Sequence, residues 1–236
     1  MHRPRLTAPV LFILAVMVSG CSSSPEEQLI SNFFRASRMR DNTTLANISM
    51  VSFRPSEEGT VRSFDIESIS EESRRPMRAK EFAEALQDAE ATEEEFAERK
   101  QAYQDENLTA IERVLEAERE GEDPGRRDLE IQEIWTEWRA EMGQHAQTIS
   151  DARAALSEER VVSEGSIFSA GSEINVMEYE GEIASKTVRI AAQVTTPDDQ
   201  TSQQTYIVTV ERAELTGPDG APVTGRWIIT SLAPVG

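Results

Sequence analysis

The chain has 236 residues, with 24 Lys and Arg against 43 Asp and Glu, which gives a formal net charge of −19. So acidic a chain is poorly suited to nucleic acid, because affinity for a phosphate backbone comes from Lys and Arg that displace counterions. The single cysteine excludes an internal disulfide, a Cys-rich zinc site and an iron–sulfur cluster.

The first twenty residues have the parts of a secretory signal. Arg3 and Arg5 form a positive start, and an apolar run follows over residues 10–18. This run is too short to span a hydrocarbon core, which needs about twenty residues. It has the dimensions of the apolar region of a signal peptide, so we expect residues 1–20 to be a cleaved signal.

The residues Val18-Ser19-Gly20-Cys21 resemble the lipobox of bacterial lipoproteins: an aliphatic residue, two small residues and the cysteine. The resemblance implies cleavage before Cys21 and lipidation of its sulfur, with a palmitate-type acyl chain usually added to the freed amine. Two or three chains anchor a protein firmly to a membrane. The alternative is a free cysteine after an ordinary signal. In the enterobacterial sorting rule, an Asp directly after the cysteine retains a lipoprotein at the inner membrane of the cell envelope. Ser22 is not Asp, which favours the periplasmic face of the outer membrane.

Residues 21–75 begin with a strong helix start, Ser24-Pro25-Glu26-Glu27, in which Ser caps the helix and Pro occupies its first turn. We expect this helix to end near residues 40–42 and a short second helix to cover residues 44–48. After a turn, residues 61–69 read as a strand. The apolar face of the first helix is formed by Leu29, Ile30, Phe33 and Phe34.

Residues 76–162 carry most of the acidity: residues 78–160 hold 24 Asp and Glu against 11 Lys and Arg. Helix breakers are absent until residues 121–125. An apolar stripe precedes this break, and a second helix of 33 residues from Asp128 follows it, about 50 Å long at 1.5 Å per residue. The pattern predicts a long antiparallel, coiled-coil-like helical hairpin, whose first helix could break near Thr92; the alternative is an isolated charged helix or a disordered acidic linker. The second helix has a heptad seam of Ile131, Trp135, Trp138, Met142, His145, Ile149, Ala152 and Leu156.

Residues 163–236 predict an antiparallel sheet. We expect a weak strand at residues 173–179, a turn at Gly181, and alternating strands at residues 188–194 and 206–210. Residues 226–232 read as the closing strand, with one face formed by Trp227 and Ile229 and the other by Ile228 and Leu232.

The order of these elements resembles the NTF2-like cone fold, and in particular the small NTF2-like lipoproteins of bacterial envelopes. The resemblance is carried by residues 29–36, 40–45, 188–194 and 227–229. It implies an α+β fold in which residues 21–75 and 163–236 form one cone of helix and antiparallel sheet, interrupted by the hairpin. The cavity of such cones binds small molecules in some members and is filled in others. Some members, such as ketosteroid isomerase, are enzymes that use Asp and Tyr, but no such catalytic position matches here.

Reactive side chains are scarce. His145 is the only histidine after the signal, and its place on the seam is typical of a packed structural residue. No motif for a nucleophile, a dinucleotide or a phosphate-binding loop occurs. We therefore expect no catalytic residue, no metal and no cofactor.

Two functions remain open. The first is a non-enzymatic, lipid-anchored envelope protein that acts as an interaction or scaffold module through its hairpin, with another envelope protein or a second copy as partner. Arg126 at the tip and Trp135 and Trp138 on the seam are its candidate contacts, although the spacing of the two indoles favours packing on the partner helix or on the cone over an open docking face. A holdase that clamps clients with the hairpin is a variant of this function.

The second function is a small-molecule-binding cone, with or without catalysis. Its candidate residues are Phe33, Phe34, Phe64, Tyr206, Trp227 and a buried Asp65.

Overall fold

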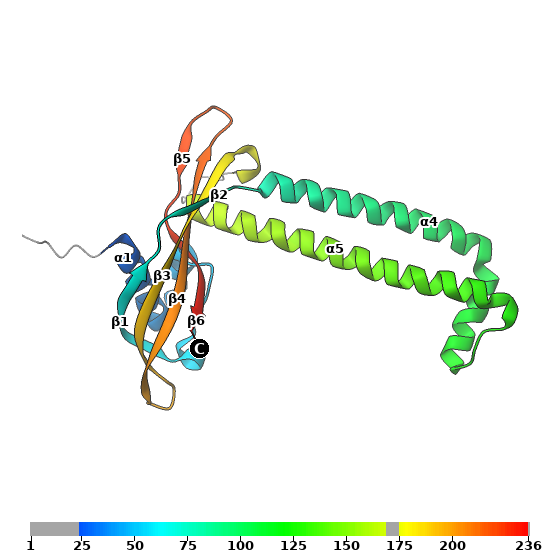
Figure 1. Cartoon of the computed structure of the whole chain (residues 1–236), viewed down its shortest axis with the longest axis horizontal. Coiled ribbons are helices and arrows are strands. Elements are labelled where there is room, and N and C mark those ends of the chain that lie inside the picture. The colour runs from blue at the N-terminus through cyan, green and yellow to red at the C-terminus, as the bar shows by residue number, and fades with distance from the viewer. Residues whose placement is uncertain (1–23, 169–174, 236) are drawn as a thin grey trace, which may run out of the picture.

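The computed structural model describes residues 24–168 and 175–235, so the expected signal and Cys21 lie outside the described residues. The chain is a mixed helix and sheet protein: a curled antiparallel sheet from which two long helices project (Figure 1). The predicted mixed class is thus confirmed. The helices are α1 (Pro25–Met39), α2 (Asn42–Ile48), α3 (Pro55–Glu58), α4 (Ala79–Glu120) and α5 (Leu129–Ile167), with 3-10 turns η1 (Arg126–Asp128) and η2 (Val176–Glu178). The strands are β1 (Thr60–Ile69), β2 (Ser73–Pro76), β3 (Glu180–Thr195), β4 (Thr201–Thr216), β5 (Pro222–Thr224) and β6 (Ile228–Pro234).

Helix α1 begins where its sequence predicts. The side chain of Ser24 accepts a hydrogen bond from the backbone N–H of Glu27 at 3.1 Å, and Pro25 occupies the first turn. The helix ends at Arg40, which adopts the left-handed conformation that satisfies the last helical carbonyls. The predicted start and end of this helix are both confirmed.

The sheet is built around the long β3–β4 pair, whose register is continuous from Glu180↔Thr216 to Thr195↔Thr201. Strands β1 and β2 pair with the outer side of β3, and β5 and β6 pair with the outer side of β4. The predicted turn at Gly181 is wrong, because this residue lies within β3 with φ of 156°. A Cβ there would lie 2.1 Å from the carbonyl oxygen of Glu214, so only glycine lets the strands pair so closely.

The predicted strand at residues 173–179 is also wrong for its described part. Residues 176–178 form the 3-10 turn η2, which Asn175 caps by accepting a hydrogen bond from the N–H of Met177 at 3.2 Å. An Asn side chain that bonds to its own backbone two residues on competes with a strand ladder. Strand β3 therefore starts only at Glu180.

The sheet carries a core on each face. One face packs against α1 and α2 through the larger cluster, in which even-numbered residues of β3 and β4 meet Ile30, Phe33 and Phe34. The other face meets the end of α5 through Ile167, Val176, Ile183, Ala213 and Leu215. A bulge between Thr209 and Val210 shifts the β6 register, so Leu232 opposes Val208 while Ile229 opposes Val210. Leu232 therefore shares the face of Ile229, and its predicted place beside Ile228 is wrong.

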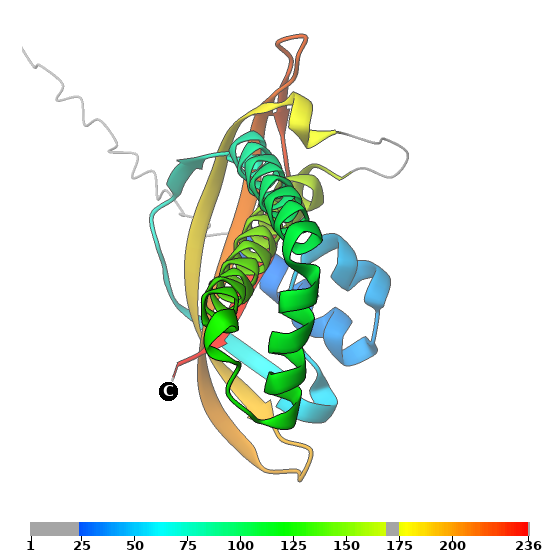
Figure 2. The ribbon, with the colours of Figure 1, turned by 90° about the vertical axis from the view of Figure 1, so that its right-hand side faces the viewer.

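Helices α4 and α5 lie side by side and extend away from the sheet (Figures 1 and 2). The suggested break near Thr92 is wrong, because α4 continues through this residue. The hydroxyl of Thr92 donates a hydrogen bond to the carbonyl of Asp88 at 2.7 Å, one turn earlier in the same helix. The interruption lies instead at Asn107, whose φ of −118° and ψ of 17° are not helical. Helix α5 has 39 residues, about 58 Å at 1.5 Å per residue, and is longer than predicted because its last turns pack on the sheet. No helix in the two described ranges has the length and apolarity needed to cross a membrane.

Candidate functional site

Residues 79–167 form an arm, the middle of which is held together by aromatic side chains. The ring of Trp138 lies 4.7 Å from that of Tyr103 and 6.4 Å from that of Phe96. Trp135 is 9% exposed, with the ammonium of Lys100 at 5.5 Å from its ring. Both tryptophans predicted as contacts thus lie against α4, which favours a packing role over an open docking face.

His145 belongs to the same seam. Its ring lies 5.0 Å from the ring of Phe96, and its Nε2 is 3.7 Å from the nearest carboxylate oxygen of Glu141 without forming a hydrogen bond. Within the described part of the chain, no group of three His, Cys, Asp or Glu side chains is placed to hold a metal ion. The surroundings of His145 are those of a packed side chain.

The tip of the arm is fixed by an ion pair. Asp128 is 4% exposed and accepts hydrogen bonds from Nε and Nη2 of Arg113 at 3.0 and 2.6 Å. The hydrogen bonds from Arg113 hold the pKa of the Asp128 carboxyl below its usual range, against the opposing effect of desolvation. Arg126, the predicted tip contact, is exposed two residues before this aspartate.

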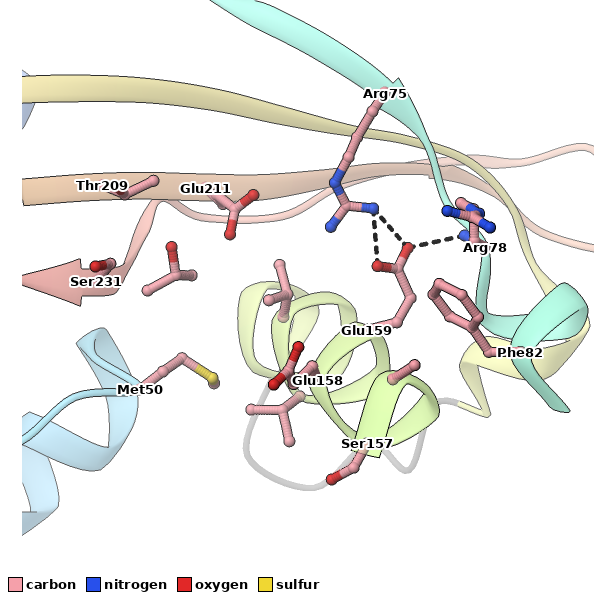
Figure 3. A pocket seen from close by; sticks show the side chains of 14 residues that line it. Met50, Arg75, Arg78, Phe82, Ser157, Glu158, Glu159, Thr209, Glu211 and Ser231 are labelled. Atoms are coloured by element: carbon pink, nitrogen blue, oxygen red, sulfur yellow. Dashed lines mark hydrogen bonds and ion pairs between the residues drawn. The ribbon is translucent and has the colours of Figure 1, made fainter. Parts of the chain in front are cut away.

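The root of the arm is joined to the sheet by a buried carboxylate. Glu159 on α5 is 4% exposed and accepts two hydrogen bonds from Nη1 of Arg75 on β2, at 2.9 and 2.8 Å (Figure 3). It also accepts the backbone N–H of Arg78 at 2.8 Å, and Arg78 is the residue that caps α4. One carboxylate therefore links β2, the start of α4 and the body of α5, and supplies the acceptor that a helix N-terminus requires.

A second link follows two turns later. The hydroxyl of Ser166 accepts the backbone N–H of Ala213 at 2.9 Å and donates to the carbonyl of Arg226 at 2.9 Å. The N–H of Arg226 in turn donates to the carbonyl of Ser166 at 2.9 Å. The end of α5 thereby satisfies backbone groups in the gap between β5 and β6, where the strand ladder is interrupted.

A cleft of about 710 Å³ opens between α5, the root of α4 and the sheet (Figure 3). Its apolar lining includes Met50, Phe82, Val161 and Val162. The guanidinium of Arg78 lies 4.5 Å from the centre of the Phe82 ring. This cleft is on the face of the sheet opposite the predicted cone cavity, and sequence reasoning did not identify it.

The predicted cone cavity is occupied by its own candidate residues. Phe33, Phe34 and Tyr206 are buried in the larger core cluster, and Phe64 and Trp227 pack against its edge. Ring centroids of Phe34 lie 5.3 Å from Phe33 and 5.9 Å from Phe64, so the aromatic side chains fill the space between α1 and the sheet.

Asp65 is not the expected buried carboxylate. It is exposed on β1, because it alternates with Phe64 and Ile66, which turn toward the core. The expectation that Asp65 is the buried acid of the cone is therefore wrong. Trp227 has instead two cations over its ring, with the ammonium of Lys186 at 5.1 Å and the guanidinium carbon of Arg212 at 4.6 Å.

Glu26 completes this arrangement at the edge of the larger core. Its carboxylate is 2.8 Å from the ammonium of Lys186. Burial raises the pKa of Glu26, but the hydrogen bond and the positive charge of Lys186, together with hydrogen bonds from the Glu26 backbone and the Ser24 side chain, outweigh burial and keep the pKa below its usual value. The Glu26–Lys186 pair therefore ties α1 to β3 beside Trp227.

Comparison with known proteins adds no relative: no family model matches the chain, and no curated protein or solved structure matches it. The residues that join the arm to the sheet, Glu159 and Ser166, were missed by sequence reasoning. A signal for them exists, since residues 159, 163 and 166 continue the 3–4 spacing of the predicted seam beyond Leu156. All three are polar and buried.

Proposed function

We propose that this chain is a non-enzymatic, lipid-anchored protein of the bacterial envelope that contacts another protein through its acidic arm. The observation that carries the proposal is the arm itself, which holds 25 Asp and Glu against 10 Lys and Arg over residues 79–167, a net charge of −15. Only its root lies against the sheet (Figure 1). Most of this long element contributes no residue to the cores of the sheet, which favours a role in contacting another molecule.

The arm favours a cationic partner surface. Its arginines are largely engaged with its own acids: Arg99 Nη2 lies 3.0 Å from Glu141, and Arg153 Nη2 lies 2.9 Å from Glu90, both across the two helices. The acidic residues outnumber these cations, so a large excess of carboxylates faces solvent. Complementary charge speeds the encounter of two proteins and suppresses wrong partners.

The NTF2-like assignment and the coiled-coil-like packing are part of the proposal. What supports the first is the placement of α1 and α2 on one face of a curled sheet in which β1 joins strands from the far end of the chain. What supports the second is the run of seam residues on α5 that meets Phe96 and Tyr103 of α4. The alternative small-molecule cone has less support, because aromatic side chains fill that space.

The anchor is tested separately from the arm. We expect radiolabelled palmitate to be incorporated into the wild-type protein in a bacterial host and to be lost in Cys21→Ser, which removes the sulfur that the lipobox resemblance modifies. Fractionation should place the labelled protein in the outer membrane. A Cys21→Ser protein that labels as strongly as wild type would end the lipoprotein proposal.

The arm is tested by site-specific photo-cross-linking in cells. A photoreactive residue is placed at Arg126 or Glu137, both exposed on the arm, and at Asp198 in the β3–β4 loop as the matched control. We expect the two arm positions to give the same discrete adduct and Asp198 to give none. Adducts of equal yield from Asp198, or only a smear of abundant neighbours, would contradict the proposal.

A further inference from the structure

The cleft at the root of the arm has an unbalanced set of charges. Its two cations are already engaged, since Arg75 is bonded to Glu159 and Arg78 to Glu81. Two carboxylates that line it, Glu158 and Glu211, form no ion pair or hydrogen bond with any side chain in the described ranges.

The two acids differ in their surroundings. Glu211 is half-buried on β4 and its side chain points from the sheet into the space above α5, whereas Glu158 is exposed on α5 (Figure 3). A partly buried carboxylate has lost some of its water and gains more from a cation than a fully exposed one does. Glu211 is therefore the stronger of the two possible contacts.

The rest of the lining is apolar where it is accessible. Val161 is 44% exposed although it belongs to the wall of the cleft, and Val162, Met50 and Phe82 line the same space. The volume of about 710 Å³ is within the range of small-molecule sites, about 300–1,000 Å³. An apolar surface beside unpaired carboxylates suits a ligand that has both an apolar body and a positive charge.

We propose that this cleft is a binding site for a small organic cation, an amine on an apolar body, whose ammonium pairs with Glu211 and Glu158 while its body covers Val161. The site is separate from the protein contact proposed for the arm and does not depend on it. It also lies on the opposite face of the sheet from the filled cone. Sequence reasoning had no access to it, because its walls come from β4, β6, α5 and the start of α4.

The test uses dansylcadaverine, a primary amine that carries an apolar fluorophore, with its N-acetylated derivative as the uncharged control. The protein is the full chain with Cys21→Ser, so that no acyl chain offers the probe a second apolar phase. Saturable binding is measured by fluorescence anisotropy for this protein, for Glu211→Gln and for Glu158→Gln. Glu137→Gln, an exposed arm residue outside the cleft, is the matched control.

We expect Glu211→Gln and acetylation of the probe each to raise the Kd about tenfold, the effect of one charge-assisted hydrogen bond. Glu158→Gln should raise it about twofold, since exposed ion pairs contribute little. Glu137→Gln should leave the Kd unchanged. Circular dichroism of each variant checks that the fold is intact, and Glu158→Gln provides the test should Glu211→Gln fail to fold.

The proposal is overturned if the acetylated probe binds as tightly as the amine, if Glu137→Gln weakens binding as much as Glu211→Gln, or if binding does not saturate. An anionic probe, anilinonaphthalene sulfonate, tests the opposite preference. Should it bind more tightly than the amine and retain its affinity in Glu211→Gln, the cleft would bind anions through Arg75 and Arg78, and the proposed cation site would be wrong.

Discussion

Replacement of Glu159 is the most direct test of how the arm is held. The carboxylate is 4% exposed and accepts three hydrogen bonds, two from Nη1 of Arg75 and one from the backbone N–H of Arg78. Glu159→Ala removes all three and leaves the N–H at the start of α4 without its acceptor. Glu159→Gln retains one oxygen for that N–H, but it removes the charge and replaces the second acceptor oxygen of the Arg75 pair with an NH2 donor.

The expected magnitudes follow from the exposure of each partner. The side chain of Arg75 is 41% exposed, so water replaces much of the lost pair and its contribution is close to a surface value of about 0.5–1 kcal/mol. The bond from the Arg78 N–H to a buried carboxylate contributes about 1.5–3 kcal/mol. Glu159→Ala is therefore expected to lower the free energy of unfolding by about 2–4 kcal/mol, and Glu159→Gln by about 1–2 kcal/mol.

Urea denaturation followed by far-ultraviolet circular dichroism measures these values, with Glu158→Ala as the control one residue away. Glu158 is exposed and has no bonded partner among the described residues, so its replacement should change stability by less than about 0.5 kcal/mol. In Glu159→Ala, the rate of hydrogen exchange should rise more in the first turn of α4 than in β3 and β4. If Glu159→Ala and Glu158→Ala have the same effect, Glu159 does not hold the root of the arm.

Three further predictions concern the tip, the middle and the end of the arm. Because Arg113 lowers the pKa of Asp128, the tip pair should stabilise the arm fully above about pH 4 and be lost as the pH falls through the lower, folded pKa; in Asp128→Asn, hydrogen exchange at the tip should lose this acid dependence. Trp138→Ala should cost about 2–4 kcal/mol in urea denaturation, because it removes half-buried aromatic packing. Gly225→Ala should lower the thermal midpoint by several degrees, since its Cβ would lie 2.0 Å from the Ser166 hydroxyl.

Each of these has a matched control in the chain. Asp123→Asn changes an exposed tip carboxylate and should leave the acid dependence intact. Met142→Ala truncates a seam residue that is 43% exposed and should cost much less than Trp138→Ala. Gly143→Ala adds a Cβ that meets nothing within 4 Å in a helix and should stabilise the protein by about 1 kcal/mol. A loss of stability in Gly143→Ala equal to that in Gly225→Ala would refute the steric argument at Ser166.

Much of the fold could be predicted because local chemistry decided it. Ser24 and Pro25 specify a helix start whatever follows, and strict alternation over residues 188–194 specifies a strand with one buried face. Errors arose where pairing with a distant strand decided the local structure. Gly181 is read locally as a turn, but the close approach of β4 places it inside a strand. The shift that moves Leu232 to the other face exists only in the pairing of β6 with β4.

The candidate site could not be predicted in the same way, because its residues are ordinary in their own surroundings. Glu159 follows Glu158 on an acidic helix, and what distinguishes them is an arginine 84 residues away in sequence. The heptad spacing nevertheless contains the missing information. Up to Leu156 the seam of α5 is mainly apolar because it meets another helix, whose backbone needs no partner.

Beyond Leu156 the same seam becomes polar at Glu159, Ser163 and Ser166, yet these residues are as buried as a core side chain. At positions 159 and 166 the helix meets groups that do need partners: the first N–H of another helix and the N–H and carbonyl of an interrupted ladder. Ser163 is the intermediate case, since its hydroxyl is satisfied by the carbonyl of Glu159 in its own helix. A change from apolar to polar along an unbroken seam therefore marks the point where α5 stops packing on α4 and begins to dock on the sheet. By this reasoning, replacing Ser166 with an apolar residue of similar size should destabilise the root of the arm, although it would make the seam more regular.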